Sequence, residues 1–149
     1  MITDYLPTFN QVEPNLLLGL TAGQVVSQIP AKADIKKTAD GKFVENGILC
    51  TIDADGKTIT NYTTGKALFI HFTEELNTFL DQRKYFAVPY EAGETYLRLV
   101  ALTPGSEWTT TIEPEDAAYA AAIGDGKVVD LGETTMPDGA AAHKYICVK

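Results

Sequence analysis

The chain has 149 residues, 45% of them hydrophobic, which suits one domain with a core large enough to fold without disulfide bonds. Its formal net charge of −8 argues against nucleic-acid binding, because phosphate contacts need clustered lysine and arginine. No apolar stretch is long enough for a membrane-spanning helix, and residues 1–7 lack the basic and apolar regions of a signal peptide. We therefore expect a protein that is made in a cytoplasm and has no membrane contact.

Residues 1–40 are expected to form an N-terminal arm, because Pro7, Pro14 and Pro30 interrupt every regular pattern in this segment. An irregular strand packed on the chain's own domain is an equal alternative, since proline interrupts both patterns. Large apolar side chains in an arm have little of their own chain to pack on, which favours contact with a partner. The predicted partner contacts are Tyr5, Leu6, Phe9, Leu16, Leu17 and Leu18.

Residues 41–149 are expected to form a β-rich domain, because turn signals separate short runs of β-branched and aromatic residues. Asn46-Gly47 and Asp55-Gly56 suit tight hairpin turns, since glycine tolerates a positive φ. These turns predict a β-meander, followed by a further strand. The predicted strands cover residues 42–44, 48–52, 57–62 and 67–72.

A helix and a second hairpin are predicted next. Thr73 can cap a helix over residues 73–83, in which apolar residues recur at helical spacing. Pro104-Gly105 fits the two central positions of a type II turn. This turn predicts a hairpin between strands at residues 96–102 and 107–112.

The last part of the chain is less regular. Residues 113–124 are ambiguous, although Pro114 suits the start of a helix and Gly124 its end. The whole pattern predicts a mainly β fold, a small antiparallel barrel or sandwich with an extended N-terminal arm and one or two short helices. Further strands are predicted at residues 85–88, 126–131 and 144–148.

The sequence offers few side chains for chemistry. It contains two His, two Cys, two Ser and two Arg, and no two of these form a known catalytic spacing. Asp53-Ala54-Asp55-Gly56 is similar to the start of a calcium loop, but the twelfth position is Thr64, which cannot supply a bidentate carboxylate. An acidic hairpin turn is therefore the favoured interpretation, and we expect no enzyme activity and no cofactor.

The histidines and cysteines also lack the spacing of a metal site. His71 and His143 show no ligand spacing with Cys50 or Cys147, so we expect no bound metal. In a cytoplasmic protein, two cysteines are more often buried apolar residues than a disulfide. We expect the same burial for most of the aromatic residues, including Trp108.

Three stretches carry a resemblance to a known family. They are GKFVENGIL at residues 41–49, IDADGK at 52–57, and YFAVP at 85–89 leading to YLRL at 96–99. In this hairpin-rich style, residues 41–112 resemble the capsid decoration, or auxiliary head, proteins of tailed bacteriophages. The resemblance implies a non-enzymatic virion structural protein that locks neighbouring subunits of the capsid lattice together. It also implies homo-oligomers, such as trimers, that contact the major capsid protein or another virion protein.

A binding module is the alternative function. A β-sandwich that binds carbohydrate or a cell surface, such as a fibre or adhesin subunit, would use exposed Trp108 and tyrosine side chains as stacking platforms. Solvent-exposed, coplanar aromatic rings would favour this alternative over lattice decoration.

Overall fold

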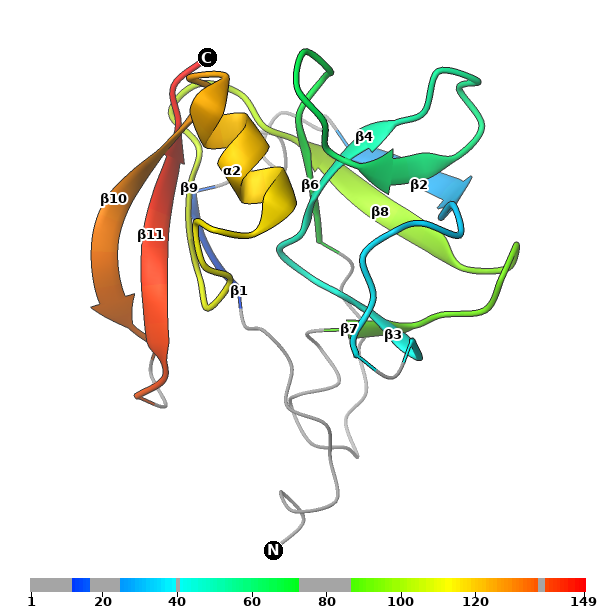
Figure 1. The fold of residues 1–149 in the computed structure, drawn as a ribbon, viewed down its shortest axis with the longest axis horizontal. Helices are drawn as coiled ribbons and strands as arrows, with labels where there is room; N and C mark the ends of the chain where they lie inside the picture. The colour runs from blue at the N-terminus through cyan, green and yellow to red at the C-terminus, as the bar shows by residue number, and fades with distance from the viewer. Residues whose placement is uncertain (1–11, 17–24, 40, 73–86, 137–138) are drawn as a thin grey trace, which may run out of the picture.

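The fold is mainly β, as the sequence predicts. The computed structural model describes residues 12–16, 25–39, 41–72, 87–136 and 139–149. The strands in chain order are β1 (Val12–Leu16), β2 (Val25–Pro30), β3 (Phe43–Glu45), β4 (Leu49–Ile52), β5 (Ile59–Asn61), β6 (Phe69–His71), β7 (Ala87–Pro89), β8 (Tyr96–Ala101), β9 (Glu107–Thr110), β10 (Val128–Thr135) and β11 (Ala141–Cys147). Within these parts of the chain there is one helix, α2 (Ala117–Gly124), and Figure 1 shows it between two sheets.

Five antiparallel strands form a barrel-like sheet in the order β2-β8-β6-β4-β5 (Figure 1). The sheet nearly closes on itself, because Ala31, directly after β2, bridges Ile59 on β5. The backbone N–H of Lys32 also donates to the Ile59 carbonyl at 2.8 Å. This contact covers part of two strand edges that would otherwise offer unpaired backbone groups.

A second antiparallel sheet has the order β1-β9-β11-β10, and β3 and β7 form a small third sheet. β10 is an edge strand with a bulge, in which Leu131 is the extra residue between Asp130 and Gly132. Gly132 adopts a φ of +112°, and its N–H donates to the Asp130 carboxylate at 2.8 Å. Both strands of this hairpin are longer than predicted, because β10 continues to Thr135 and β11 begins at Ala141.

The predicted hairpin between residues 96–102 and 107–112 is wrong, although its turn is right. The Ser106 N–H donates to the Thr103 carbonyl at 3.1 Å, and Gly105 has a φ of +97°, as a type II turn requires. β8 and β9 nevertheless lie in different sheets, and β9 is paired instead with β1 and β11. At this corner the Gly105 N–H donates to the Cys147 carbonyl at 2.7 Å.

The predicted β-meander is right only in part. β4 and β5 form a hairpin, but β3 pairs with β7, which is distant in sequence. The turn between β3 and β4 therefore leads the chain from the third sheet into the barrel. Gly47 in this turn has a φ of +92°, and a Cβ atom there would lie 3.2 Å from Cβ of Val12. Glycine is needed at this position for both reasons.

Parts of residues 1–40 belong to the two main sheets. β1 pairs with β9, and β2 pairs with β8. These stretches match the alternative of strands packed on the chain's own domain, and Leu16 is paired with Glu107. The other predicted partner contacts lie outside the described residues, as does the predicted helix 73–83; these contacts are Tyr5, Leu6, Phe9, Leu17 and Leu18.

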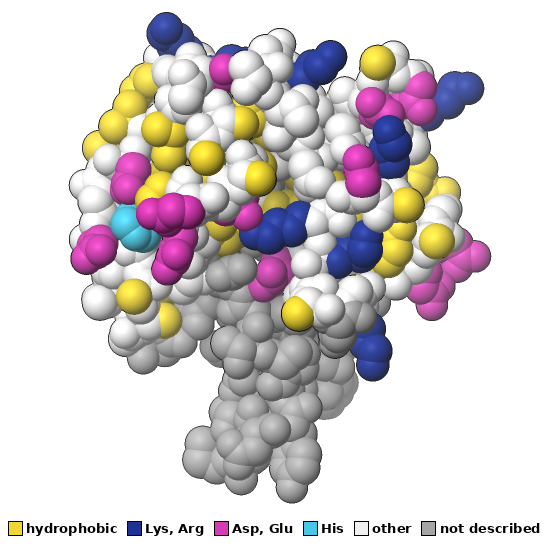
Figure 2. Space-filling view, viewed as in Figure 1, with side chains coloured by type: hydrophobic (Ala, Val, Ile, Leu, Met, Phe, Trp, Pro, Cys, Tyr) yellow, Lys and Arg dark blue, Asp and Glu magenta, His cyan; other side chains and the backbone are white. Residues whose placement is uncertain are grey.

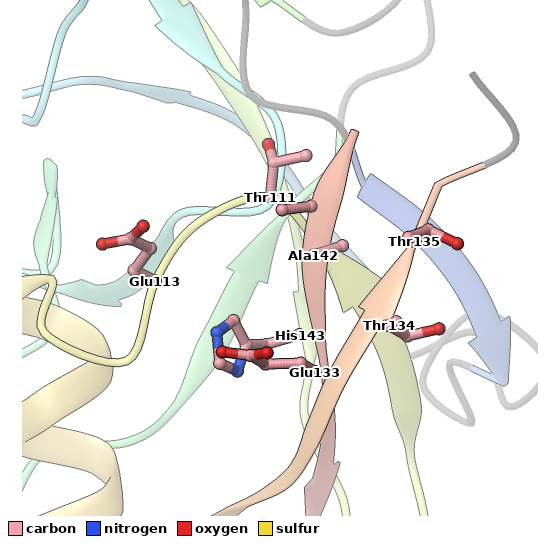
Figure 3. A pocket seen from close by; sticks show the side chains of 8 residues that line it. Thr111, Glu113, Glu133, Thr134, Thr135, Ala142 and His143 are labelled. Atoms are coloured by element: carbon pink, nitrogen blue, oxygen red, sulfur yellow. The ribbon is translucent and has the colours of Figure 1, made fainter. Parts of the chain in front are cut away.

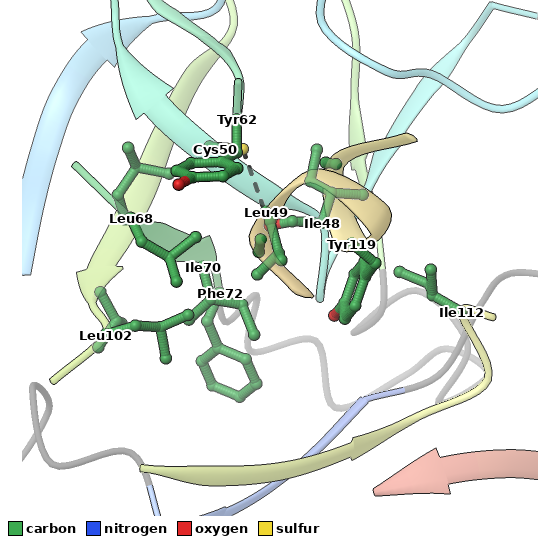
Figure 4. Packing of buried hydrophobic residues seen from close by; sticks show 14 of the residues in the cluster. Ile48, Leu49, Cys50, Tyr62, Leu68, Ile70, Phe72, Leu102, Ile112 and Tyr119 are labelled. Carbon is green, nitrogen blue, oxygen red and sulfur yellow. Dashed lines mark hydrogen bonds between the residues drawn. The ribbon is translucent and has the colours of Figure 1, made fainter. Parts of the chain in front are cut away.

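The core lies between the barrel-like sheet, the second sheet and α2. Figure 4 shows apolar side chains of β4 and β6, including Leu49 and Ile70, converging beside the Tyr119 ring of α2. Ala118 and Ala122 of the same helix are also buried. The ambiguous segment 113–124 is thus helical from Ala117 onward. Small side chains on the buried side let the helix backbone approach both sheets closely.

Candidate functional site

Aromatic residues of the second sheet and of α2 form a buried, hydrogen-bonded cluster. Trp108, Tyr119 and Tyr145 are each 0% exposed. The Trp108 Nε1–H donates to the Tyr119 hydroxyl at 3.0 Å, and that hydroxyl donates to the Gly47 carbonyl at 2.5 Å. The Tyr145 hydroxyl donates to the Ile112 carbonyl at 2.8 Å. Trp108 is therefore a core residue, and it cannot stack on a sugar as the alternative function requires.

His71 is also structural. It is fully buried on β6, and its Nδ1 lies 2.8 Å from the Glu45 carbonyl oxygen, so Nδ1 carries the proton and donates. Burial disfavours the charged ring and lowers the pKa of His71 to about 4. The uncharged His71 side chain thus links β6 to β3 through this hydrogen bond.

Cys50 and Cys147 are buried and unpaired, which confirms the prediction for them. Burial raises the pKa of each thiol, because the thiolate would lose its hydration. A raised pKa removes the thiolate that nucleophilic or metal-binding cysteines need.

The acidic turn at residues 53–56 connects β4 and β5, as predicted. The Gly56 N–H donates to the Asp53 carbonyl at 2.8 Å, and Gly56 has a φ of +70°. The Asp53 carboxylate lies 3.0 Å from Lys32 Nζ, and this hydrogen bond lowers the pKa of Asp53. Among the described residues, no group of three or more His, Cys, Asp and Glu side chains is placed to hold a metal ion.

Polar contacts fasten both ends of α2 to the barrel-like sheet. Lys36 binds the carboxylate of Asp116, the residue before the helix. At the other end, the Asp125 carboxylate accepts a hydrogen bond from the Tyr62 hydroxyl at 2.6 Å and from the Gly65 N–H at 3.0 Å. The Tyr62 hydrogen bond lowers the pKa of Asp125. These contacts fix the position of α2 between the barrel-like sheet and the second sheet.

A groove of about 620 Å³ lies along α2. Its lining combines alanine side chains of α2 with polar side chains of the loop after β5. The lining residues are Lys36, Asn61, Tyr62, Thr63, Thr64, Asp116, Ala117, Ala118 and Ala121. Tyr62 and Ala118 are buried, so the groove is a shallow surface over the core.

A second hollow, of about 380 Å³, lies beside β10 and β11. We call it the acidic hollow, because Glu113 and Glu133 line it together with His143 (Figure 3). His143 Nδ1 lies 3.2 Å from the Asp130 carboxylate. The other lining residues are Thr111, Thr134, Thr135, Ala141 and Ala142. Figure 2 shows acidic side chains grouped around the one histidine visible on that face.

The other side of the same two strands carries exposed apolar groups, which we call the outer strip. It consists of Val129, its cross-strand partner Ile146 and Val148, with the exposed Leu131 in the adjoining bulge. Val129, Leu131 and Val148 are 42%, 50% and 44% exposed, whereas most large apolar side chains of the described residues are buried. The sequence did not single out these residues, although Val128-Val129 indicates a strand that is apolar on both sides.

Comparison with known proteins identifies no relative. No protein-family model, no curated protein and no solved structure matches this chain. In the parts of the chain that the structure describes, no helix has the length and apolar character needed to span a membrane.

Proposed function

We propose that this chain is a non-enzymatic virion structural protein that binds and stabilises an assembled capsid lattice of a tailed bacteriophage. The observation that carries the proposal is that side chains able to perform chemistry are buried inside the protein. His71, Ser106, Trp108 and Cys50 are each 0% exposed. The described residues present to solvent a β-sheet structure supported by α2, shallow hollows and the exposed outer strip. Such a surface suits contact with another protein.

The sequence resemblance of residues 41–112 supports the same role, and the negative charge suits it. A formal net charge of −8 keeps copies of a protein soluble when they are crowded. A protein that binds only the assembled lattice stabilises that lattice by its binding free energy. Because many copies bind one particle, a modest affinity at each position adds up to a large effect.

The structure determines which deletion can test the N-terminal contact. A deletion of residues 1–20 would also remove β1, whose Val12 is 4% exposed and lies against Gly47. Deleting residues 2–10 leaves β1 in place. We expect this shorter deletion to abolish co-sedimentation with purified phage heads while the circular dichroism spectrum stays unchanged.

A matched variant tests the apolar contacts without changing the length of the chain. Replacing Tyr5, Leu6 and Phe9 together by serine is expected to weaken head binding as the deletion does, because the proposed contacts are apolar. Undiminished binding by both variants would remove the N-terminal segment from the docking surface. Absence of the chain from the purified particles of its phage, measured by mass spectrometry, would contradict the proposed function itself.

A further inference from the structure

The connection from β2 to β3 closes the barrel-like sheet, although it is not itself a strand. We call its residues 31–37 the strap, and Figure 1 shows it leaving β2 and running toward β3. Its first two residues make backbone contacts with β5, because Ala31 bridges Ile59 and the Lys32 N–H donates to the Ile59 carbonyl. From residue 33 onward the strap belongs to no strand or helix, so other contacts must hold it against β5.

Asn61, at the end of β5, makes the central contacts with the strap. Its side-chain oxygen accepts a hydrogen bond from the Lys36 N–H at 2.8 Å, and its side-chain N–H donates to the Asp34 carbonyl at 2.8 Å. The neighbouring Thr60 hydroxyl donates to the Asp34 carboxylate at 3.0 Å. Side chains of β5 thus take the place of the backbone hydrogen bonds that join the paired strands of this sheet.

Two ion pairs also hold the strap, and both are open to solvent. Lys32 Nζ lies 3.0 Å from the Asp53 carboxylate in the turn between β4 and β5, and Lys36 binds Asp116 before α2. The two lysine side chains are 47% and 38% exposed. Ion pairs of this kind add little to stability, because water competes for both charges.

Ile35 is the buried anchor of the strap. Its side chain is 2% exposed and belongs to the same core cluster as Ile59. Of the residues in the strap, only Ala31 is buried to a similar degree. A segment with few buried side chains and solvent-exposed polar contacts opens at a lower free energy than strands paired within a core.

We propose that the strap opens as one unit while the rest of the barrel-like sheet stays folded. Opening frees the outer edge of β5, where the Ile59 carbonyl can then pair with an extended segment of another chain. It also removes Lys36 from the lining of the groove along α2. The closed strap is therefore a cover over a strand edge and over part of the groove. This inference goes beyond the proposed function, since it concerns the free protein.

Amide hydrogen exchange, followed by NMR on the full chain, tests the proposal. The Lys32 amide donates to Ile59, and the Ile35 amide donates to the Lys32 carbonyl, so both are protected only while the strap is closed. The His71 and Leu102 amides donate to carbonyls inside the barrel-like sheet. We expect the two strap amides to share one degree of protection, at least about tenfold below that of the sheet amides. Equal protection of all four amides would overturn the proposal.

Asn61→Ala distinguishes a strap that opens as one unit from a set of independent contacts. The substitution removes both side-chain hydrogen bonds of Asn61, but it leaves the carbonyl partners of the Lys32 and Ile35 amides in place. Because the closed strap loses two hydrogen bonds, we expect these two amides to exchange about tenfold faster. Faster exchange of the Lys36 amide alone would contradict opening as a unit. Thr63→Ala, in an exposed residue of the loop after β5, is the control and is expected to change nothing.

Ile35→Val tests the buried anchor against a matched substitution elsewhere in the sheet. Loss of one buried methyl group from the strap is expected to speed the exchange of the Lys32 amide about fivefold. Ile70→Val removes the same methyl group from the fully buried side chain on β6. It is expected to speed the exchange of the Leu102 amide and to leave the Lys32 amide unchanged. A strap that opens only with the whole fold would respond equally to both substitutions, and that result overturns the proposal.

Discussion

The inner and outer sides of the second sheet use similar residues in opposite ways. On the inner side, Trp108 and Tyr145 are fully buried, and their polar atoms are hydrogen-bonded to Tyr119 and Ile112. On the outer side, Val129 and Leu131 remain about half exposed next to solvated charges. The same sheet therefore supplies folding free energy through one side, whereas its other side leaves apolar groups in contact with solvent. Substitutions on the two sides are expected to differ in their effect on stability.

Trp108→Ala is expected to have the largest effect on stability. Truncating a fully buried aromatic side chain leaves a cavity and costs about 3–5 kcal/mol of unfolding free energy. It also removes the N–H that donates to the Tyr119 hydroxyl. Urea unfolding measures the loss, and Tyr96→Ala on the exposed side of β8 is the control, expected to change stability little. Equal losses for the two variants would contradict the assignment of Trp108 to the core.

The burial of His71 makes the stability of the fold depend on pH. Because the folded pKa of His71 is about 4, below the value of 6.5 for an accessible histidine, the unfolded state binds a proton first as the pH falls. The contribution of His71 to stability is therefore constant above about pH 6.5 and declines by about 3 kcal/mol as the pH drops toward 4. His71→Gln removes this titration and is expected to flatten the profile in that window. An unchanged decline in His71→Gln would show that other groups cause it.

Tyr119→Phe is expected to have a smaller effect than the loss of Trp108. The change keeps the ring but removes a hydroxyl that accepts from Trp108 and donates to Gly47. Two buried polar groups then lose a partner, which costs about 1–3 kcal/mol. Tyr145→Phe is the matched control, because the hydroxyl of Tyr145 has one such bond in the structure, to Ile112. The urea midpoint is expected to fall further for Tyr119→Phe, and the reverse order would refute the central position of Tyr119.

Local features of the fold could be predicted from the sequence, whereas the pairing of distant segments could not. The type II turn at Pro104-Gly105 and the hairpin turn at Asp55-Gly56 depend on a few adjacent residues, and both are present. The pairing of β3 with β7 depends on which strands meet after collapse, and no local pattern specifies it. Proline marks an interruption but does not say whether the flanking residues join a sheet, which is why β1 and β2 could not be separated from an arm.

The candidate surfaces were harder to predict than the fold for a related reason. Val129 and Leu131 look in the sequence like other strand residues, but the structure leaves both about half exposed. Glu113 and Glu133 are distant in sequence and line one hollow because the loop after β9 passes beside the ribbon. The burial of Trp108, by contrast, can be predicted from the size of its side chain alone, and the structure confirms it.

Leu131→Asp is expected to have the smallest effect on stability. Leu131 is 50% exposed in the bulge of β10, where a Cγ carboxylate can be solvated without leaving a cavity. Such a surface substitution typically changes the unfolding free energy by less than about 0.5 kcal/mol. Urea unfolding of this variant beside the unaltered protein measures the change. A loss of stability similar to that of Tyr119→Phe would mean that the outer strip also supports the fold, and that the two sides of the sheet are not independent.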